Sequence, residues 1–204
     1  MNNKLSKKTF FYYGWLFGYG YFLTSLYWIT ISLTFDKNLQ YLIPISLIII
    51  PAFLALFYGL ITYFFSLFKI KSLISSFFLF SLLFGLVEFL RGNILTGFPW
   101  NLTIYSMSNS VNFLSFISVI GTYSFNLIII SFFTFPAVYI LRKSKKEIFL
   151  CIVFLLLPII FFSYSLFYKQ EFLSNKLVKN SHIIRIISSD ISLDRFYNND
   201  EPEN

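Results

Sequence analysis

Charged residues are scarce in this chain of 204 residues, of which only 12% are Asp, Glu, Lys or Arg. A soluble globular domain carries about 25% charged residues, so the composition excludes an ordinary soluble fold. The chain also has one cysteine, Cys151, and one histidine, His182. A lone cysteine forms no intrachain disulfide, and a histidine without a second candidate ligand nearby does not indicate a metal site. The sequence therefore predicts neither a disulfide framework nor a bound metal, and it indicates no other cofactor.

In place of charge the chain has apolar residues, which make up 57% of the sequence and gather in long runs. A helix that crosses a bilayer needs about 20 mostly apolar residues. Five runs satisfy this requirement, so we predict an integral membrane protein whose residues 1–168 form an all-α bundle of about five transmembrane helices. The predicted spans are residues 10–33, 41–68, 72–90, 111–141 and 148–168.

The basic residues lie mainly on one side of the predicted bundle, and the connections on the opposite side carry only Lys37 and Arg91. Because short cytoplasmic segments are enriched in Lys and Arg, we expect the N-terminus in the cytoplasm and the C-terminal tail in the periplasm of a Gram-negative bacterium. The same placement argues against a phosphate-binding patch, so nucleic acid is not an expected partner. The basic side comprises Lys4, Lys7, Lys8, Lys69, Lys71, Arg142, Lys143, Lys145 and Lys146.

Residues 169–204 are polar and contain one β-branched run, HIIRIIS at residues 182–188. Such a run predicts a strand, but a single strand is not stable alone in water. Two alternatives stay open: the rest of its sheet lies in sequence absent from this chain, or the tail is disordered. The serines and aspartates that follow form no catalytic triad with any residue in view.

Gly14 and Gly18 form a GxxxG pattern in the first predicted span. Small residues at this spacing let two membrane helices approach closely. We therefore favour helix packing over a ligand site for this segment.

Glu88 and Arg91 are ionisable residues close to the end of the third predicted span. A charge at the centre of a bilayer costs about 2.5–3.5 kcal/mol on insertion scales. Their spacing of three residues places them on one helix face, where they can form an ion pair. Two interpretations stay open: a functional site, or an interfacial pair that anchors the helix end and lets Arg91 reach the lipid headgroups.

A turn follows this pair, because Gly97 and Pro99 are turn-forming residues. Phe98 and Trp100 would lie at the outer membrane interface. The whole connection, residues 92–112, is apolar for a loop, so we expect it to lie on the membrane surface or dip into it. We hypothesise that Arg91 holds a phospholipid headgroup there while the lipid tails enter between helices. The competing interpretation is a purely structural loop.

Three stretches resemble the apolipoprotein N-acyltransferase family of bacterial inner-membrane enzymes. GWLFGYGYFLTSLYWITISL (14–33) resembles a glycine- and aromatic-rich helix of the family, and GTYSFNLIII (121–130) is similar to a segment that opens a later helix. EFLRGNILTGFPWNLTIYS (88–106) resembles the family's Glu-x-x-Arg-Gly … Thr-Gly-Phe-Pro-Trp motif. This last match is the most specific, because it is long and unusual in composition.

The resemblance implies a membrane bundle that supports a periplasmic nitrilase-like αββα domain with a Glu-Lys-Cys triad. The cysteine takes an acyl chain from a phospholipid as a thioester and passes it to the S-diacylglyceryl-cysteine at the N-terminus of an apolipoprotein. Residues 183–191 resemble the first strand of that domain, so we expect residues 169–204 to be its truncated start. None of the triad positions is present and Cys151 lies in a span, so the resemblance implies no catalytic residue in this chain.

We therefore expect the membrane portion of an apolipoprotein N-acyltransferase, a fragment that is inactive alone and that a separate chain carrying the remaining nitrilase-like domain would complete. The alternative is a non-catalytic membrane scaffold or lipid-binding remnant. A small transporter is disfavoured, because it requires polar or ionisable groups at mid-span. The expected lipid-guiding residues are Glu88, Arg91, Gly97, Phe98, Pro99 and Trp100.

Overall fold

The computed structural model describes residues 6–94, 97, 99, 101–109 and 114–174 of the chain. All regular structure within these residues is helical, which agrees with the all-α bundle expected from the sequence. The elements are α1 (Lys7–Leu26), η1 (Tyr27–Thr34), η2 (Lys37–Leu42), α2 (Ile43–Leu67), α3 (Leu73–Asn93), η3 (Thr103–Met107), α5 (Ile117–Ile120), α6 (Thr122–Leu141) and α7 (Lys145–Ser174), where η marks a 3-10 helix.

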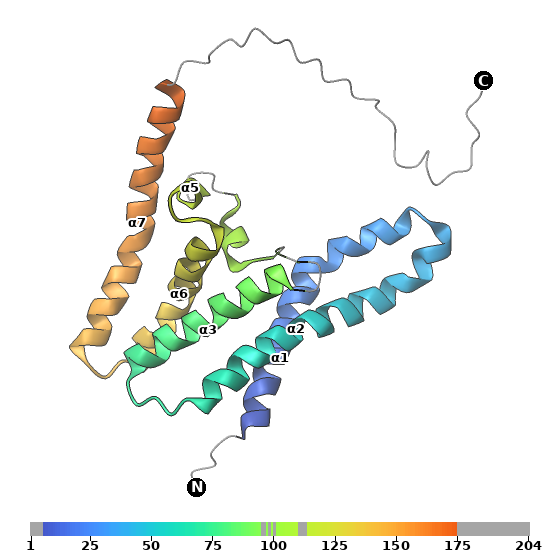
Figure 1. Cartoon of the computed structure of the whole chain (residues 1–204), viewed down its shortest axis with the longest axis horizontal. Helices are drawn as coiled ribbons and strands as arrows, with labels where there is room; N and C mark the ends of the chain where they lie inside the picture. The colour runs from blue at the N-terminus through green and yellow to red at the C-terminus, as the bar shows by residue number, and fades with distance from the viewer. Residues whose placement is uncertain (1–5, 95–96, 98, 100, 110–113, 175–204) are drawn as a thin grey trace.

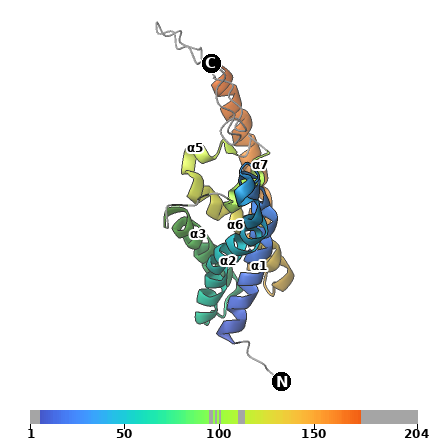
Figure 2. The same ribbon diagram turned by 90° about the vertical axis from the view of Figure 1, so that its right-hand side faces the viewer.

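The long helices form an open bundle in which each packs mainly on its neighbour in the chain (Figure 1). α1 packs along α2, α2 contacts α3, α3 contacts α6, and α6 contacts α7. The start of α1, the α2–α3 connection and the α6–α7 connection lie toward the lower end of Figure 1. Figure 2 shows that the same helices form a narrow layer when the molecule is turned by 90°. The basic residues of those three segments therefore gather at one end of the bundle.

The close contact between α1 and α2 depends on the two glycines of the GxxxG pattern. A Cβ atom on Gly14 would lie 2.2 Å from Thr62 Oγ1 and 2.4 Å from the carbonyl oxygen of Tyr58, and one on Gly18 would lie 2.8 Å from Tyr58 Cβ. No real Cβ atom fits at such distances, so only glycine permits this approach. The helix-packing interpretation of Gly14 and Gly18 is confirmed.

Among the described residues, four helical segments are long and apolar enough to cross a membrane, namely Lys37–Leu67, Leu73–Asn93, Thr122–Leu141 and Lys145–Glu171. The first predicted run, residues 10–33, is not one of them. It divides into α1, which is rich in glycine and tyrosine, and the 3-10 helix η1, in which Thr30, Ser32 and Thr34 donate hydrogen bonds to nearby carbonyl oxygens. The glycine and polar residues of this run therefore separate it from the four apolar segments, of which Lys37–Leu67 also includes a 3-10 helix, η2.

The fourth predicted span, residues 111–141, begins later than expected, because Gly121 interrupts the helix. Gly121 has a φ of +80°, a left-handed conformation that glycine adopts readily and other residues avoid. The short helix α5 precedes it, and α6 starts at Thr122. The sequence prediction placed the start of this span too early.

The connection between α3 and α6 turns into the bundle. Leu102 and Ile104 are 1% and 0% exposed, and they pack in a core cluster with Phe125 and Ile129 of α6 and Phe161 of α7. Helices of the same protein therefore cover these two apolar residues, and the expectation that the connection lies on the membrane surface or dips into it stays a prediction.

At the C-terminal end, α7 extends past residue 168 to Ser174. The predicted strand at residues 182–188 and the rest of the tail lie outside the described residues. The predicted start of a nitrilase-like domain at residues 169–204 therefore stays a prediction.

Candidate functional site

Glu88 and Arg91 both lie in the last turns of α3 and are 0% and 2% exposed. Arg91 Nη2 lies 3.8 Å from Glu88 Oε1, so the ion pair predicted from their spacing is confirmed. The Arg91 side chain turns into the protein and does not extend to the surface, which differs from the interfacial anchor considered from the sequence. A buried charge is costly unless it is paired and hydrogen-bonded, so the surrounding groups decide what this pair does.

The Glu88 carboxylate accepts hydrogen bonds from three separate segments of the chain. Tyr58 Oη of α2 donates to Oε1 over 2.9 Å, and Asn126 Nδ2 of α6 donates to Oε2 over 2.5 Å. From the connection, Thr103 Oγ1 donates to Oε1 over 3.3 Å and the Thr103 N–H donates to Oε2 over 3.4 Å. These bonds compensate the burial of the carboxylate. They also make Glu88 the point at which α2, α3, α6 and the connection meet.

Asn126 extends this network to the backbone of the connection. Its Oδ1 accepts a hydrogen bond of 2.8 Å from the Ile104 N–H, while its Nδ2 donates to Glu88. The side chain is 0% exposed, so no water competes for either bond. Asn126 lies within the stretch 121–130 that resembles the family, but the sequence alone does not distinguish it as a site residue. The feature that could have identified it is a side-chain amide inside an apolar run, because such amides join membrane helices by hydrogen bonds.

Arg91 and two residues of α1 form hydrogen bonds with Asn101, which comes before Thr103 in the connection. The Asn101 carbonyl oxygen accepts bonds from Arg91 Nη2 over 3.3 Å and from Tyr21 Oη over 3.1 Å. Its Nδ2 donates to Ser25 Oγ over 2.7 Å. The Arg91 guanidinium also lies 5.4 Å from the ring centroid of Phe22, a cation–π distance. Asn101 has a φ of +56°, so these bonds stabilise a left-handed backbone that asparagine tolerates better than most residues.

The predicted turn residues are only partly described. Gly97 has a φ of +74°, and its N–H donates to the carbonyl oxygen of Ile94 over 3.0 Å, as in a tight turn. A Cβ atom there would lie 2.9 Å from the carbonyl oxygen of Gly92, so this position requires glycine. Pro99 is half-buried. Phe98 and Trp100 lie outside the described residues, and their predicted roles stay predictions.

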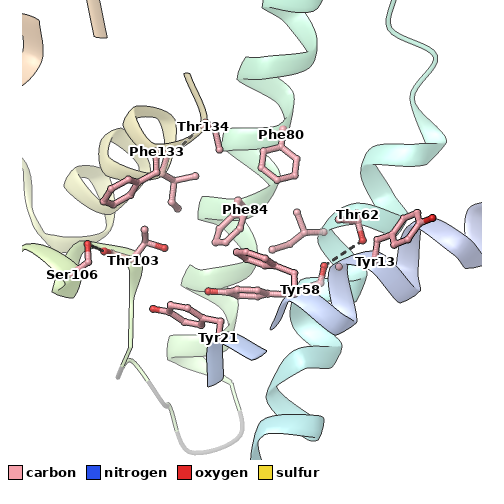
Figure 3. A pocket seen from close by; sticks show the side chains of 14 residues that line it. Tyr13, Tyr21, Tyr58, Thr62, Phe80, Phe84, Thr103, Ser106, Phe133 and Thr134 are labelled. Carbon is pink, nitrogen blue, oxygen red and sulfur yellow. Dashed lines mark hydrogen bonds between the residues drawn. The ribbon is translucent and has the colours of Figure 1, made fainter. Parts of the chain in front are cut away.

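A cleft of about 470 Å³ lies beside the Glu88 network, between α1 and α2 on one side and α6 on the other (Figure 3). Phe80 and Phe84 of α3 line it, together with Phe133 of α6. Thr103 and Ser106 line the part nearest the connection. The cleft is therefore largely apolar, with hydroxyl groups where the connection meets it.

The described side chains of this site fix the position of the connection relative to the helices, and none of them is a reactive nucleophile. The carboxylate and the guanidinium are both engaged with protein groups, and the buried Cys151 lies in another core cluster with Phe77, Val138 and Phe154. Within the part of the chain that the structure describes, no three His, Cys, Asp or Glu side chains lie close enough to bind a metal ion. What the site can do is position the connection and the cleft beside it.

Comparison with known proteins connects this geometry to a family. Residues 1–135 match the family model described as the apolipoprotein N-acyltransferase N-terminal domain. The chain belongs to this family. In this member of the N-acyltransferase family, the match ends before α7. It includes every residue whose side chain belongs to the Glu88 network, namely Tyr21, Ser25, Tyr58, Glu88, Arg91, Asn101, Thr103 and Asn126. The four apolar helices and the family together identify a multi-pass membrane protein.

Curated relatives carry the same family name. The chain is 38% identical over 130 residues to the apolipoprotein N-acyltransferase of Rhodopseudomonas palustris, an alignment that covers 62% of this chain and 24% of the relative. It is 33% identical over 140 residues to that of Rhizobium etli, covering 65% and 25%, and 35% identical over 125 residues to that of Brucella melitensis, covering 61% and 23%. The chain spans about a quarter of the length of these relatives. No solved structure matches the chain.

Proposed function

We propose that this chain is the membrane portion of an apolipoprotein N-acyltransferase, which transfers an acyl chain from a phospholipid to the N-terminal S-diacylglyceryl-cysteine of apolipoproteins. The main support is the match of residues 1–135 to the N-terminal domain of that family. The covalent step, formation of a thioester on a cysteine, belongs in this proposal to a nitrilase-like domain that begins within residues 169–204. This proposal assigns no role as nucleophile, acid or base to residues 1–168.

The proposed topology has five crossings, with α1 and η1 forming the first. The start of α1 and the basic α2–α3 and α6–α7 connections face the cytoplasm, and the connection between α3 and α6 faces the periplasm, as does the C-terminal tail. Support comes from the basic residues, which gather at one end of the bundle, because cytoplasmic segments are enriched in Lys and Arg. In this proposal the membrane is the bacterial inner (plasma) membrane.

The proposed role of the site residues is to guide the phospholipid toward the catalytic cysteine. Glu88 and Arg91 act indirectly in this proposal, because both are buried and both bind the connection at Thr103 and Asn101. In this proposal they hold the connection so that Gly97, Phe98, Pro99 and Trp100, the turn predicted from the sequence, meet the lipid. The support is that charge-assisted hydrogen bonds, which are stronger than neutral ones, join the connection to Glu88 and Arg91 of α3. Tyr58 of α2 and Asn126 of α6 bind the same Glu88 carboxylate, and neutral bonds from Asn101 to Tyr21 and Ser25 join the connection to α1.

A chimera tests the proposed function. The part of the Rhodopseudomonas palustris relative that aligns with this chain is replaced by the aligned residues of this chain, and the chimera is expressed in cells depleted of their own enzyme. We expect mass spectrometry of lipoprotein N-termini to detect the N-acylated form. An Arg91→Ala chimera should lose most of it. A chimera that inserts in normal amounts and yields no N-acylated lipoprotein would instead favour a non-catalytic scaffold or lipid-binding remnant.

A further inference from the structure

Two connections at one end of the bundle are strongly basic. One is the α2–α3 connection, and the other is the α6–α7 connection with the first turn of α7. Glu147 is the only acidic residue in these two segments. Their basic residues, all with exposed side chains, are Lys69, Lys71, Arg142, Lys143, Lys145 and Lys146. We call these six residues the basic face.

Helix packing unites the basic face, although its two parts are far apart in the sequence. Phe77 near the start of α3, Val138 near the end of α6 and Cys151 near the start of α7 belong to one core cluster. The rings of Phe77 and Phe154 lie 5.2 Å apart, so α3 and α7 are in direct contact. The sequence alone indicates orientation for these basic residues and disfavours a phosphate-binding patch. The packing changes this interpretation, because it anchors both connections on the same cluster.

The acidic side chain beside the basic face does not neutralise its lysines. The Glu147 carboxylate is 8% exposed and accepts hydrogen bonds from the backbone N–H groups of Lys143 and Ser144, the latter over 2.8 Å. The Arg142 guanidinium donates to the Tyr139 carbonyl oxygen and lies 3.7 Å from the centroid of the Tyr139 ring. Among the described residues, the five lysines of the basic face form no ion pair. Their charges are therefore available to an anion from outside the chain.

Exposed apolar side chains lie between and beside the basic residues. Phe68 and Ile70, which alternate with Lys69 and Lys71, are 53% and 37% exposed, and Phe149 at the start of α7 is 68% exposed. A soluble anion or a nucleic acid would leave these apolar groups in water, which is unfavourable. The boundary of a bilayer accommodates both kinds of side chain, because lysine buries its apolar stem and keeps its charge among the headgroups. The basic face therefore fits a membrane surface.

The basic face and the α3–α6 connection lie at opposite ends of α3. Lys71 comes just before this helix, and Arg91 lies in its last turn. A helix of 21 residues is about 31 Å long, which is close to the thickness of about 30 Å of the hydrocarbon core of a bilayer. A headgroup at the basic face therefore belongs to the opposite leaflet from one at the α3–α6 connection. It is not the lipid that this connection is proposed to guide.

We propose that the basic face binds the phosphate groups of anionic phospholipids, and that both connections contribute to this binding. A cluster of about four to eight basic residues next to the end of a membrane helix is typical of such recognition. The lipids are ligands here and not substrates, since they hold the ends of α3, α6 and α7 at the membrane surface. The binding does not depend on acyl transfer. In the topology proposed above, this leaflet is the cytoplasmic one.

Native mass spectrometry of the full chain tests the proposal. The protein, purified in an uncharged detergent, is titrated with phosphatidylglycerol or with phosphatidylcholine that has identical acyl chains. The two probes then differ in headgroup charge, and orientation in a membrane does not affect the result. A basic residue near the headgroups strengthens binding of anionic lipid about fivefold. Since several act together, we expect phosphatidylglycerol to bind about tenfold more tightly than phosphatidylcholine, or better.

Substitutions separate the basic face from charge in general. A triple variant with Lys143, Lys145 and Lys146 changed to Gln should bind phosphatidylglycerol about tenfold more weakly and phosphatidylcholine unchanged. The same three positions changed to Arg keep their charge and should bind both lipids as the unaltered protein does. Lys71→Gln should weaken phosphatidylglycerol binding about fivefold. Its matched control is Lys37→Gln, at an exposed lysine that lies next to Asp36 and toward the opposite end of the bundle; this control should have no effect.

Equal affinities for the two lipids would overturn the inference, as would a preference that the Gln variants leave intact. An equal loss in Lys37→Gln, or in the Arg variant, would also overturn it, because the cause would then not be the charge of this face. Glycerophosphoglycerol, the same headgroup without acyl chains, should bind at least tenfold more weakly than the lipid. Equal binding would instead assign the face to a soluble anion. The chimera plays no part in these measurements, so the inference and the proposed function can fail separately.

Discussion

Asn126 offers the most direct test of the view that buried hydrogen bonds hold the connection between α3 and α6. Replacement of Asn126 by leucine keeps the approximate size of the side chain and removes both of its hydrogen bonds. The Glu88 carboxylate loses its shortest contact, of 2.5 Å, and the Ile104 N–H loses its acceptor at 2.8 Å. Since Ile104 is 0% exposed, water cannot replace that acceptor without a structural opening.

The expected loss of stability follows from these two bonds. A hydrogen bond to a charged group contributes about 1.5–3 kcal/mol, and a buried group left unsatisfied costs about 1–3 kcal/mol. Interhelical hydrogen bonds measured in membranes contribute less, on average about 0.6 kcal/mol each, because the unfolded chain also finds partners in the bilayer. A loss of about 2 kcal/mol lies between these limits and corresponds to about 30-fold in the opening equilibrium.

Hydrogen exchange measures this opening locally. We expect the peptide that contains Ile104 to exchange about 30-fold faster in Asn126→Leu than in the unaltered protein, both in the same detergent. The control is Asn93→Leu, because Asn93 is exposed and its Nδ2 donates to the Phe89 carbonyl oxygen one turn earlier on the same helix. Such a surface change alters stability by about 0.5 kcal/mol or less. Unchanged exchange at Ile104 in Asn126→Leu would refute the role given to Asn126.

Three further substitutions test other parts of the structure. Glu88→Ala and Glu88→Gln both leave Arg91 buried without its carboxylate, so denaturant unfolding should show a loss of about 3–5 kcal/mol in the alanine variant and a smaller loss in the glutamine variant, which keeps an acceptor oxygen. A loss near zero in both would contradict the stabilising role of the ion pair. Gly14→Leu should separate α1 from α2 and lower the unfolding temperature, whereas Gly20→Leu should not, because no atom lies within 4 Å of a Cβ there. Gly97→Ala forces alanine into a left-handed conformation at a cost of about 1–2 kcal/mol, and an unchanged unfolding temperature would show that the turn adapts.

Local patterns predicted much of the fold. The second and third apolar runs correspond closely to α2 and α3, the fifth run lies within the longer α7, and the spacing of Glu88 and Arg91 predicted their contact. The first run was harder to interpret, because η1 is a 3-10 helix and hydropathy does not distinguish it from an α-helix. The late start of α6 depends on the conformation of Gly121, and a glycine in an apolar run is compatible with either a continuous or a broken helix.

The candidate site depended on contacts between distant segments. Asn126 and Thr103 bind Glu88 from positions 38 and 15 residues away along the chain, and Tyr58 does so from 30 residues away. No local pattern specifies which of the polar residues in the apolar runs will meet one carboxylate. The family resemblance identified the segments that contain Glu88, Thr103 and Asn126 but not their arrangement.

The sequence by itself determined that this protein is helical, apolar enough for a membrane and a member of its family, because composition, hydropathy and motif depend only on residue order. The tertiary structure alone decided that Glu88 and Arg91 face inward, that the connection folds between helices and that a cleft lies beside it. The physical reason is that a buried charge is tolerated only where enough donors and acceptors converge on it, and that convergence exists only once the helices have packed.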